Sequence, residues 1–216
     1  READYSIYTH AGPEIAVAST KAYTSQVTLL NILAIYFAEV LESTSKDIIT
    51  KFKKEILELP AKVEEALKCS DDIKDFSKKI YQEKDVFFLG RGVDYNTALE
   101  ASLKLKEISY IHSDAYAAGE LKHGPIALIE NDVTVISVIT DENLVEKTIS
   151  NIQEVISRGA KTLVISSLEL PSNNIDFVIN IPHTSVFLSP IVSIIPFQLL
   201  SYFISKEKGL DVDKPR

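Results

Sequence analysis

The sequence has a single cysteine and no excess of basic residues, which argues against a disulfide-rich, metal-rich or nucleic-acid-binding protein. Cys69 is the only cysteine, so the chain can form neither an internal disulfide nor a cysteine-rich metal site, and a reducing cytoplasm is the expected location. Lys and Arg number 23 against 31 Asp and Glu, giving a net charge of −8 without any basic stripe. We therefore expect no nucleic-acid partner.

Long uncharged runs are also few. Two of them, Ala22–Ala38 and Thr184–Ser205, come near the ~20 residues that cross a bilayer. The first contains Gln26 and Asn31, the second contains two prolines, and neither has the flanking charge asymmetry of a membrane span. We expect two buried core helices and no membrane partner. Methionine and a signal peptide are both absent, which favours a piece of a longer protein.

The pattern after residue 84 predicts an α/β fold. With 45% hydrophobic and 25% charged residues, the 216-residue chain can bury a core. Runs rich in Val, Ile and Phe predict four strands, at Asp85–Leu89, Val133–Ile139, Thr162–Ser166 and Phe177–Ile181. Helical patterns separate or follow them, at Asn96–His112, Glu142–Arg158 and Pro190–Lys208, and Gly159 and Gly209 follow the last two. This order predicts a doubly wound parallel sheet of four or five strands, flanked by helices.

The first 84 residues have a different pattern. A strand-like alternation at Tyr5–Tyr8 precedes a long apolar helical pattern from Thr20 to Glu42, and one strand and one helix cannot cover each other's apolar faces. The charged, amphipathic stretch that follows predicts a helical connector in which Pro60 divides the helices. The predicted division is 1–42 for the end of a preceding lobe, 43–84 for the connector, 85–209 for the α/β lobe and 210–216 for the start of a tail.

The loop Gly90–Asp94 follows the first predicted strand of the sheet and begins a helix. Its two glycines permit close backbone approach, and a helix N-terminus favours an anion, as in a phosphate-binding loop. A tight strand-to-helix turn explains the same residues, and the third glycine of a dinucleotide loop is missing because position 95 is Tyr. Both interpretations stay open.

Two groups of charged residues are candidates for catalysis. Glu100, Lys104 and Glu107 share one side of the predicted helix, where a solvated charged stripe is the plain interpretation. Downstream, the stretch AYAAGELKHGPIALI embeds a Glu, Lys, His cluster ending at His123 among apolar and small residues, and such surroundings are costly for charges without a use.

Glu107 and His123 together are the residue types needed to isomerise a sugar. One group moves a proton between adjacent carbons through an enediol, another opens the ring, and Glu and His titrate in the range that suits both steps. A nearby Lys can hold the developing oxyanion or form a Schiff base. His10, His112 and His183 have no metal-ligand spacing, so we expect no metal and no cofactor.

The motifs LKLKEISYIH, AYAAGELKHGP, AGPEIAVASTKAYT and the terminal DVDKPR carry a family resemblance. The chain resembles the sugar isomerase half of the glucosamine-6-phosphate synthases, the glutamine:fructose-6-phosphate amidotransferase family, whose lobes are SIS domains. The resemblance covers nearly the whole chain. It implies a flavodoxin-like, three-layer SIS fold and a role in amino-sugar biosynthesis, with fructose 6-phosphate and glucosamine 6-phosphate as ligands.

The resemblance also implies roles for individual residues. Glu107 corresponds to the base that moves the proton between C1 and C2, His123 to the ring-opening histidine that the partner subunit of a homodimer supplies, and Lys104 to a lysine near the sugar. Val17 and Ser19 correspond to positions that line the sugar site through backbone and hydroxyl contacts.

The family's phosphate loop, its glutaminase domain and its Schiff-base lysine are not found in these 216 residues, so we expect part of an active site. Two alternatives remain: a non-catalytic SIS module that senses a phosphosugar, and a related SIS isomerase or deglycase acting on another sugar phosphate.

Overall fold

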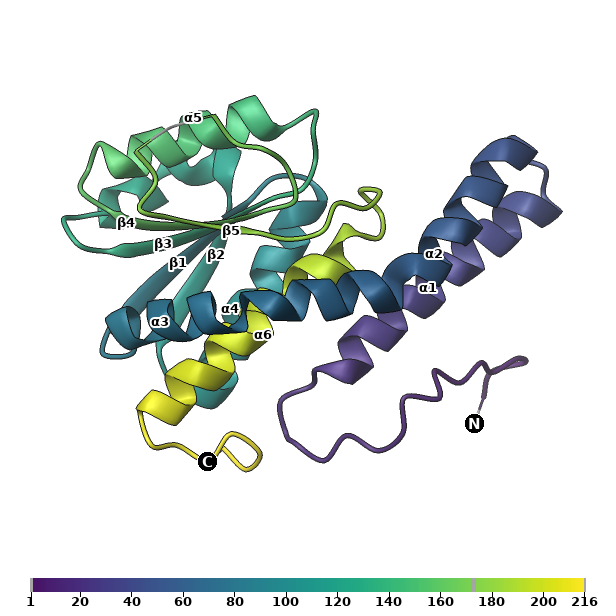
Figure 1. Cartoon of the computed structure of the whole chain (residues 1–216), viewed down its shortest axis with the longest axis horizontal. Coiled ribbons are helices and arrows are strands. Elements are labelled where there is room, and N and C mark those ends of the chain that lie inside the picture. Colours follow the sequence, from purple (N-terminus) through teal and green to yellow (C-terminus); the bar gives the residue numbers. More distant parts are fainter. Residues whose placement is uncertain (1, 172–173, 216) are drawn as a thin grey trace.

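The computed structural model describes residues 2–171 and 174–215, and it shows an α/β body with a two-helix arm (Figure 1). The elements, in chain order, are α1 (Lys21–Val40), α2 (Lys46–Ala66), η1 (Leu67–Cys69), α3 (Ser70–Ile80), β1 (Asp85–Gly90), α4 (Val93–Ser109), β2 (His112–Ala117), η2 (Ala118–His123), η3 (Pro125–Leu128), β3 (Thr134–Ile139), α5 (Val145–Ile156), β4 (Lys161–Ser166), β5 (Phe177–Asn180) and α6 (Ser189–Glu207).

The sheet has five parallel strands in the order β2-β1-β3-β4-β5. The strand order reverses between β1 and β3, which is the arrangement of doubly wound, flavodoxin-like folds. All six residues of β3 are buried, because helices cover both faces of the sheet. The predicted fold class is confirmed, and each of the four predicted strands is present.

The fifth strand, β2, is absent from the sequence prediction. It is an edge strand with most of its side chains only half-buried, so it lacks the continuous apolar run of the inner strands. The helix expected to reach His112 ends at Ser109 instead. Tyr110 follows it in the left-handed conformation, at φ +60°, and this residue ends the helix.

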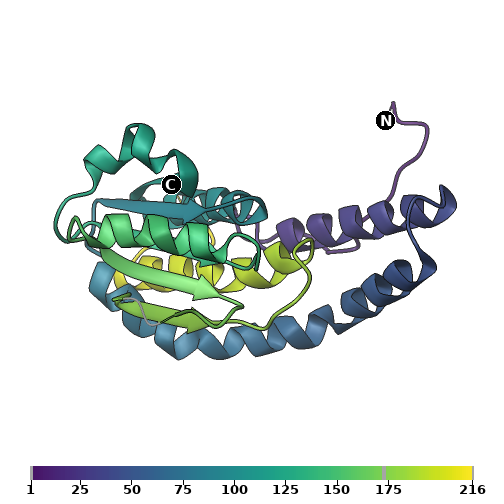
Figure 2. The same cartoon turned by 90° about the horizontal axis from the view of Figure 1, so that it is seen from above.

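Three helices, α3, α4 and α6, cover one face of the sheet, and α5 with η2 and η3 covers the other (Figures 1 and 2). Helix α6 is apolar around most of its circumference and packs against both α3 and α4. Within this core the rings of Phe88 and Phe197 meet edge to face, with centroids 5.9 Å apart. The prediction of a buried core helix in Thr184–Ser205 is confirmed.

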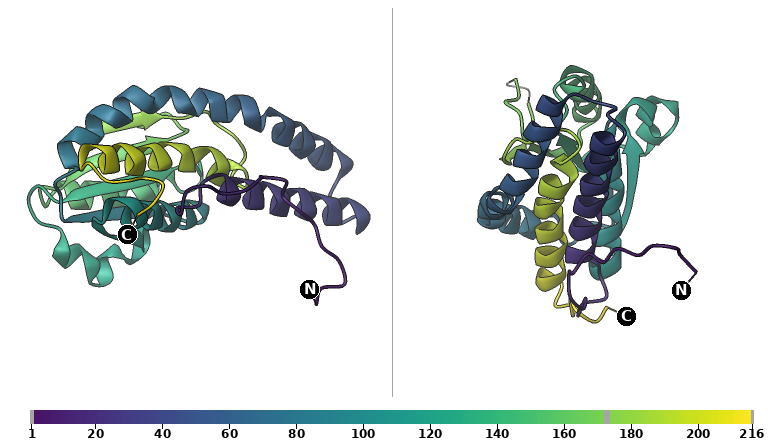
Figure 3. Two further views of the ribbon diagram at one scale, coloured as in Figure 1. Left: turned by 90° about the horizontal axis from the view of Figure 1, so that it is seen from below. Right: turned by 90° about the vertical axis from the view of Figure 1, so that its right-hand side faces the viewer.

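The corresponding prediction for Ala22–Ala38 is wrong. No residue of α1 is fully buried, and Leu30, Tyr36 and Phe37 are more than half exposed. The main contacts of α1 are with α2 and α6, and its far end extends away from the α/β body (Figure 3). Within residues 2–171 and 174–215, no helix is both long and apolar enough to cross a membrane.

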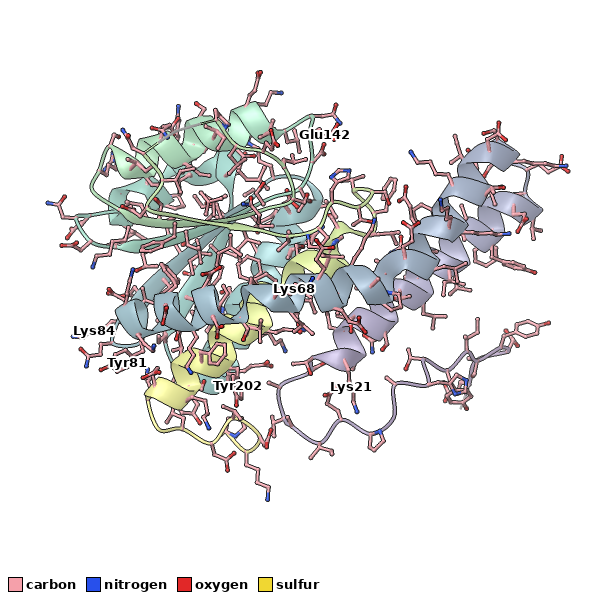
Figure 4. The ribbon with its side chains drawn as sticks, in the orientation of Figure 1. Lys21, Lys68, Tyr81, Lys84, Glu142 and Tyr202 are labelled. Carbon is pink, nitrogen blue, oxygen red and sulfur yellow. The ribbon has the colours of Figure 1, made fainter. Side chains whose placement is uncertain are left out.

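Two further predictions for the first 84 residues are wrong. Pro60 does not divide the helices but lies inside α2, and the helical path continues through η1, near Lys68 in Figure 4, into α3. Pro60 is exposed, so water can hydrate the carbonyl that loses its helical donor. The stretch Tyr5–Tyr8 forms no strand, because no neighbouring strand is present to pair with it.

Candidate active site

Lys104 is the centre of the charged cluster on α4. Its residue is 3% exposed, so it is buried despite its charge. The ammonium Nζ lies 2.6 Å from Glu107 Oε2 and 3.4 Å from Glu100 Oε1. Two carboxylates therefore compensate one buried cation, which overturns the interpretation of these residues as a solvated stripe.

The helical repeat of α4 produces this arrangement. Residues three and four positions apart share one face of a helix, so the Lys104 stem lies between the two glutamates. The side chain of Glu100 is 16% exposed and that of Glu107 is 32% exposed. Glu107 is thus the more accessible of the two carboxylates, and its contact with Lys104 restricts its orientation.

Helix α1 supplies a neighbour that the sequence did not suggest. Tyr23 and Glu100 line a cavity of about 520 Å³ between α1 and α4. Burial, and then the nearby Glu100 carboxylate, raise the pKa of Tyr23 to about 12. The phenol therefore keeps its proton at physiological pH. No local sequence signal links these two residues, because they lie on helices far apart in the chain.

Val17 and Ser19 lie in the segment that precedes α1. The backbone N–H of Val17 donates to the carbonyl of Asp213 at 3.1 Å, which joins this segment to the C-terminal tail. Glu14 Oε2 accepts from the N–H of Ala22 at 3.1 Å and so caps α1, whose base lies at Lys21 in Figure 4. Two hydrogen bonds thus join this segment to the C-terminal tail and to the start of α1.

His123 is exposed at the end of η2. Gly124 follows it at φ +151°, a conformation that residues other than glycine rarely adopt. At this glycine the chain leaves η2 and enters η3. Within one chain His123 and Glu107 are not brought together. Helix α4 runs from the carboxyl ends of the strands to their amino ends, which places Glu107 about 20 Å along the helix from its start. His123 follows the carboxyl end of β2.

The loop Gly90–Asp94 has the geometry of a tight strand-to-helix turn. A Cβ on Gly90 would overlap the carbonyl carbon and oxygen of Asp94, so the turn itself requires this glycine. Arg91 points to α5, where its Nε and Nη2 donate to Asn151 Oδ1 at 3.2 and 3.1 Å. The side chain that would attract a phosphate is therefore already engaged.

Asp94 adds a buried carboxylate to the same turn. Its Oδ2 accepts from the N–H of Thr140 at 2.8 Å, its Oδ1 accepts from the hydroxyl of Thr140, and that hydroxyl also lies 2.8 Å from Ser189 Oγ. Burial raises the pKa of Asp94 to about 6, against the lowering effect of the Thr140 hydrogen bonds. This carboxylate disfavours an anion at the start of α4.

Across the described residues, no group of three or more His, Cys, Asp and Glu side chains is arranged to hold a metal ion. The chemistry offered by the described residues is therefore that of a carboxylate, an ammonium and, on a separate surface, an imidazole.

Comparison with known proteins identifies the family. The family model of the SIS domain matches residues 79–204, which is more than half of the chain. The chain belongs to the SIS domain family. The match begins within α3 and includes every strand of the sheet, α4 with its charged cluster, and η2 with His123.

The curated relatives of this SIS chain share one name. Glutamine–fructose-6-phosphate aminotransferase (isomerizing) of Clostridium perfringens is 56% identical over 220 residues, and the protein of the same name from Clostridium tetani is 53% identical over 218. Each alignment covers 100% of this chain and 36% of the relative. The SIS chain therefore spans about a third of the length of these relatives.

Solved structures locate that third. The C-terminal domain of glucosamine-fructose-6-phosphate aminotransferase from Francisella tularensis superposes with a TM-score of 0.92 at 41% identity, covering 95% of this chain and 59% of that one. A putative phosphosugar isomerase from Clostridium difficile shares the fold, with a TM-score of 0.87 at 24% identity. The SIS chain thus corresponds to part of the C-terminal domain of a glucosamine-fructose-6-phosphate aminotransferase.

Proposed function

We propose that the chain is part of an enzyme that converts fructose 6-phosphate and glutamine-derived ammonia to glucosamine 6-phosphate. The observation that carries this proposal is the partly exposed Glu107 carboxylate, held 2.6 Å from the buried ammonium of Lys104. Sequence identity of 56% to a relative with this activity in its name supports it over the full length of the chain.

Glu107 acts as the base in this proposal. Once the ring is open and ammonia has replaced the C2 carbonyl oxygen with loss of water, the carboxylate takes a proton from C1 and returns it to C2. The proton of the C1 hydroxyl moves to the imine nitrogen, so that the step balances. The product is an aldehyde at C1 and an amine at C2. Lys104 orients the carboxylate and supplies positive charge where the oxygen of C1 gains electron density.

In this proposal His123 opens the ring of the sugar that is bound to the neighbouring subunit. Its exposed position at the end of η2, on the side of the sheet where the strands end, supports this role, because Glu107 lies near the opposite end of α4. One chain therefore does not supply both groups to one sugar. A homodimer in the cytoplasm completes the proposal, with Val17 and Ser19 lining the sugar through backbone and hydroxyl contacts.

The remaining parts of the site belong to a longer protein. We assign residues 1–42 to the end of a first SIS lobe, 43–84 to a connector, 85–209 to a second SIS lobe and 210–216 to the start of a tail; Arg1 and Arg216 lie outside the described residues. The exposed apolar residues of α1 support contact with that first lobe. A glutaminase domain supplies the ammonia.

A chimera tests the catalytic assignment. Residues 1–216 replace the matching segment of the Clostridium perfringens relative, and exchange of the C1 hydrogen of fructose 6-phosphate is followed by NMR in heavy water. Substitution Glu107→Gln keeps the size of the side chain but removes the base. The exchange rate is expected to fall by about 10²–10⁴-fold, while the affinity for the sugar changes by less than about threefold.

The matched control is Glu58→Gln, because Glu58 is an exposed glutamate on α2 whose lysine partners are 3.9 Å away. Exchange in this control is expected to equal that of the parent chimera. Retained exchange in the Glu107→Gln chimera would exclude Glu107 as the base. Tight sugar binding without exchange in the parent chimera would instead favour a phosphosugar-sensing module.

A further inference from the structure

The 3-10 helix η2 carries His123, and polar side chains from two other elements hold it in place. The guanidinium of Arg91, from the β1–α4 turn, donates through Nε and Nη2 to Asn151 Oδ1 on α5. The same guanidinium lies directly over η2, because a Cβ added at Gly119 would be 2.9 Å from Arg91 Nη2. Arg91 is therefore enclosed between α5 and η2, and Asn151 is 6% exposed.

A second contact holds the end of η2 that bears the imidazole. Lys122 Nζ lies 2.7 Å from Glu154 Oε1, and Lys122 directly precedes His123. Glu154 is 22% exposed at its side chain and lies three residues after Asn151, so both contacts come from one face of α5. Figure 2 shows η2 and η3 beside α5.

Apolar packing alone fixes only the start and the middle of η2. Ala118 and Leu121 are fully buried in the core between η2 and the sheet, whereas Lys122, His123 and Gly124 are exposed. Short 3-10 helices have weak hydrogen bonds and unravel easily at their ends. Without the polar contacts, the imidazole would be carried only by the exposed last turn of η2, which is followed by a glycine.

We propose that Arg91, Asn151, Lys122 and Glu154 form a bracket that positions His123 for ring opening in the neighbouring subunit. These are positioning residues, since none of them touches the sugar in this scheme. The inference rests on the proposed function, because the bracket matters for catalysis only if His123 acts on a sugar ring. It also explains the Gly90–Asp94 loop, whose arginine holds a catalytic element in place.

The chemistry of the bracket makes it sensitive to conservative changes. Arginine presents two donors in a planar fork to Asn151, and a lysine cannot reproduce this geometry, although it keeps the charge. Glu154→Gln keeps the shape but removes the charge that attracts Lys122. Displacement of a catalytic group by about 1 Å can lower a rate by about 10²-fold.

The test separates ring opening from the later steps by using two substrates. Fructose 6-phosphate is mainly cyclic, whereas 5-deoxyfructose 6-phosphate lacks the hydroxyl that closes the ring. Turnover of both is measured in the chimera described above, with Arg91→Lys, Glu154→Gln and the double variant. We expect kcat on fructose 6-phosphate to fall by about 10–100-fold and kcat on the 5-deoxy sugar to change by less than about threefold.

Two controls calibrate the result. His123→Ala is expected to lower kcat selectively on the cyclic sugar as well, by a larger factor than the bracket variants. Lys78→Gln removes an exposed ion pair on α3, where Lys78 Nζ lies 2.8 Å from Asp75, and is expected to leave both rates unchanged.

An equal loss on both sugars in the Arg91→Lys and Glu154→Gln chimeras would overturn the bracket, because it would show a general structural role. Unchanged rates on both sugars in the double variant would also overturn it. If the unsubstituted chimera turned over neither sugar, the proposed function would fail, and the bracket with it.

Discussion

Asp94 is a carboxylate whose position is set by the turn it occupies. It is 3% exposed, and Thr140 donates to both of its oxygens. The hydrogen bonds stabilise the ionised form, but burial has the larger effect and raises the pKa to about 6 from an ordinary 3.8. The folded state therefore holds a proton between about pH 4 and 6 that the unfolded state releases.

The pH dependence of this residue has a definite sign. The stabilising contribution of the protonated carboxyl is fully present below pH 3.8 and is lost as the pH rises through about 6, at a total cost of roughly 3 kcal/mol. Asp94→Asn keeps the contacts with Thr140, because its amide can accept from the N–H and donate to the hydroxyl. The variant is therefore expected to melt higher than the parent chimera at pH 7.5 by several degrees, and the difference is expected to shrink toward pH 5.

Scanning calorimetry of the two chimeras from pH 5 to 8 measures that difference. Asp75→Asn is the matched control, because Asp75 is an exposed carboxylate on α3 whose pKa is lowered by a hydrogen bond from Lys78. A difference between Asp94→Asn and parent that stays constant across this range would contradict the assignment of the effect to Asp94.

Single residues differ in how far the sequence predicts them. The spacing of Glu100, Lys104 and Glu107 is visible in the sequence because a helix repeats every 3.6 residues. The burial of Lys104 is not, because it depends on helices far away in the chain. Likewise, nothing local marks Arg91 and Asn151, which are 60 residues apart, as partners.

At the scale of elements, the turn between β1 and α4 depends on one glycine. Gly90 has no room for a Cβ, since the nearest contacts are backbone atoms of Asp94 that cannot move aside without displacing α4. Gly90→Ala is therefore expected to destabilise the domain by more than about 3 kcal/mol or to prevent folding.

Gly209→Ala is the comparison for this prediction. Gly209 also ends an element, with φ +68° and open space around it, so its substitution carries only the strain of a left-handed alanine, about 1–2 kcal/mol. Both variants are compared by thermal unfolding of the chimera. Equal melting temperatures for the two variants would contradict the prediction, because Gly90→Ala would then cost no more than the strain of a left-handed alanine.

The elements themselves were predictable where their pattern reflects burial on both faces. Inner strands such as β3 and β4 are rich in Val, Ile and Leu, and α6 is apolar around most of its circumference, so the sequence indicates them directly. The sequence did not predict the edge strand β2, because β2 is half-exposed. It also did not predict that α2 continues through Pro60, because this proline lies on a solvent-facing side.

At the scale of the molecule, the arm formed by α1 and α2 presents apolar side chains to solvent. Tyr36, Phe37, Val40 and Leu41 are all more than half exposed, and side chains project on every side of the arm (Figure 4). A groove of about 500 Å³ lies between α1, α2 and α6, and it is lined mainly by apolar side chains such as Ile32. Patches of this kind favour association.

We expect the 216-residue chain alone to self-associate or to be poorly soluble. The triple substitution Tyr36→Ser, Phe37→Ser and Leu41→Ser removes apolar area from the arm without touching the sheet, so it is expected to reduce association. Analytical ultracentrifugation of the two chains between about 5 and 100 μM measures the effect. A monodisperse monomer that melts cooperatively in the unsubstituted chain would contradict the prediction.

Helix α6 has a consequence for how the protein folds during synthesis. It packs against both α3 and α4, yet it follows all five strands in the chain, so it leaves the ribosome after every strand that it covers. Until it emerges, one apolar face of a growing parallel sheet has no complete cover. The nascent chain is thus prone to misassembly late in translation, and we expect molecular chaperones to bind it mainly before α6 has been synthesised.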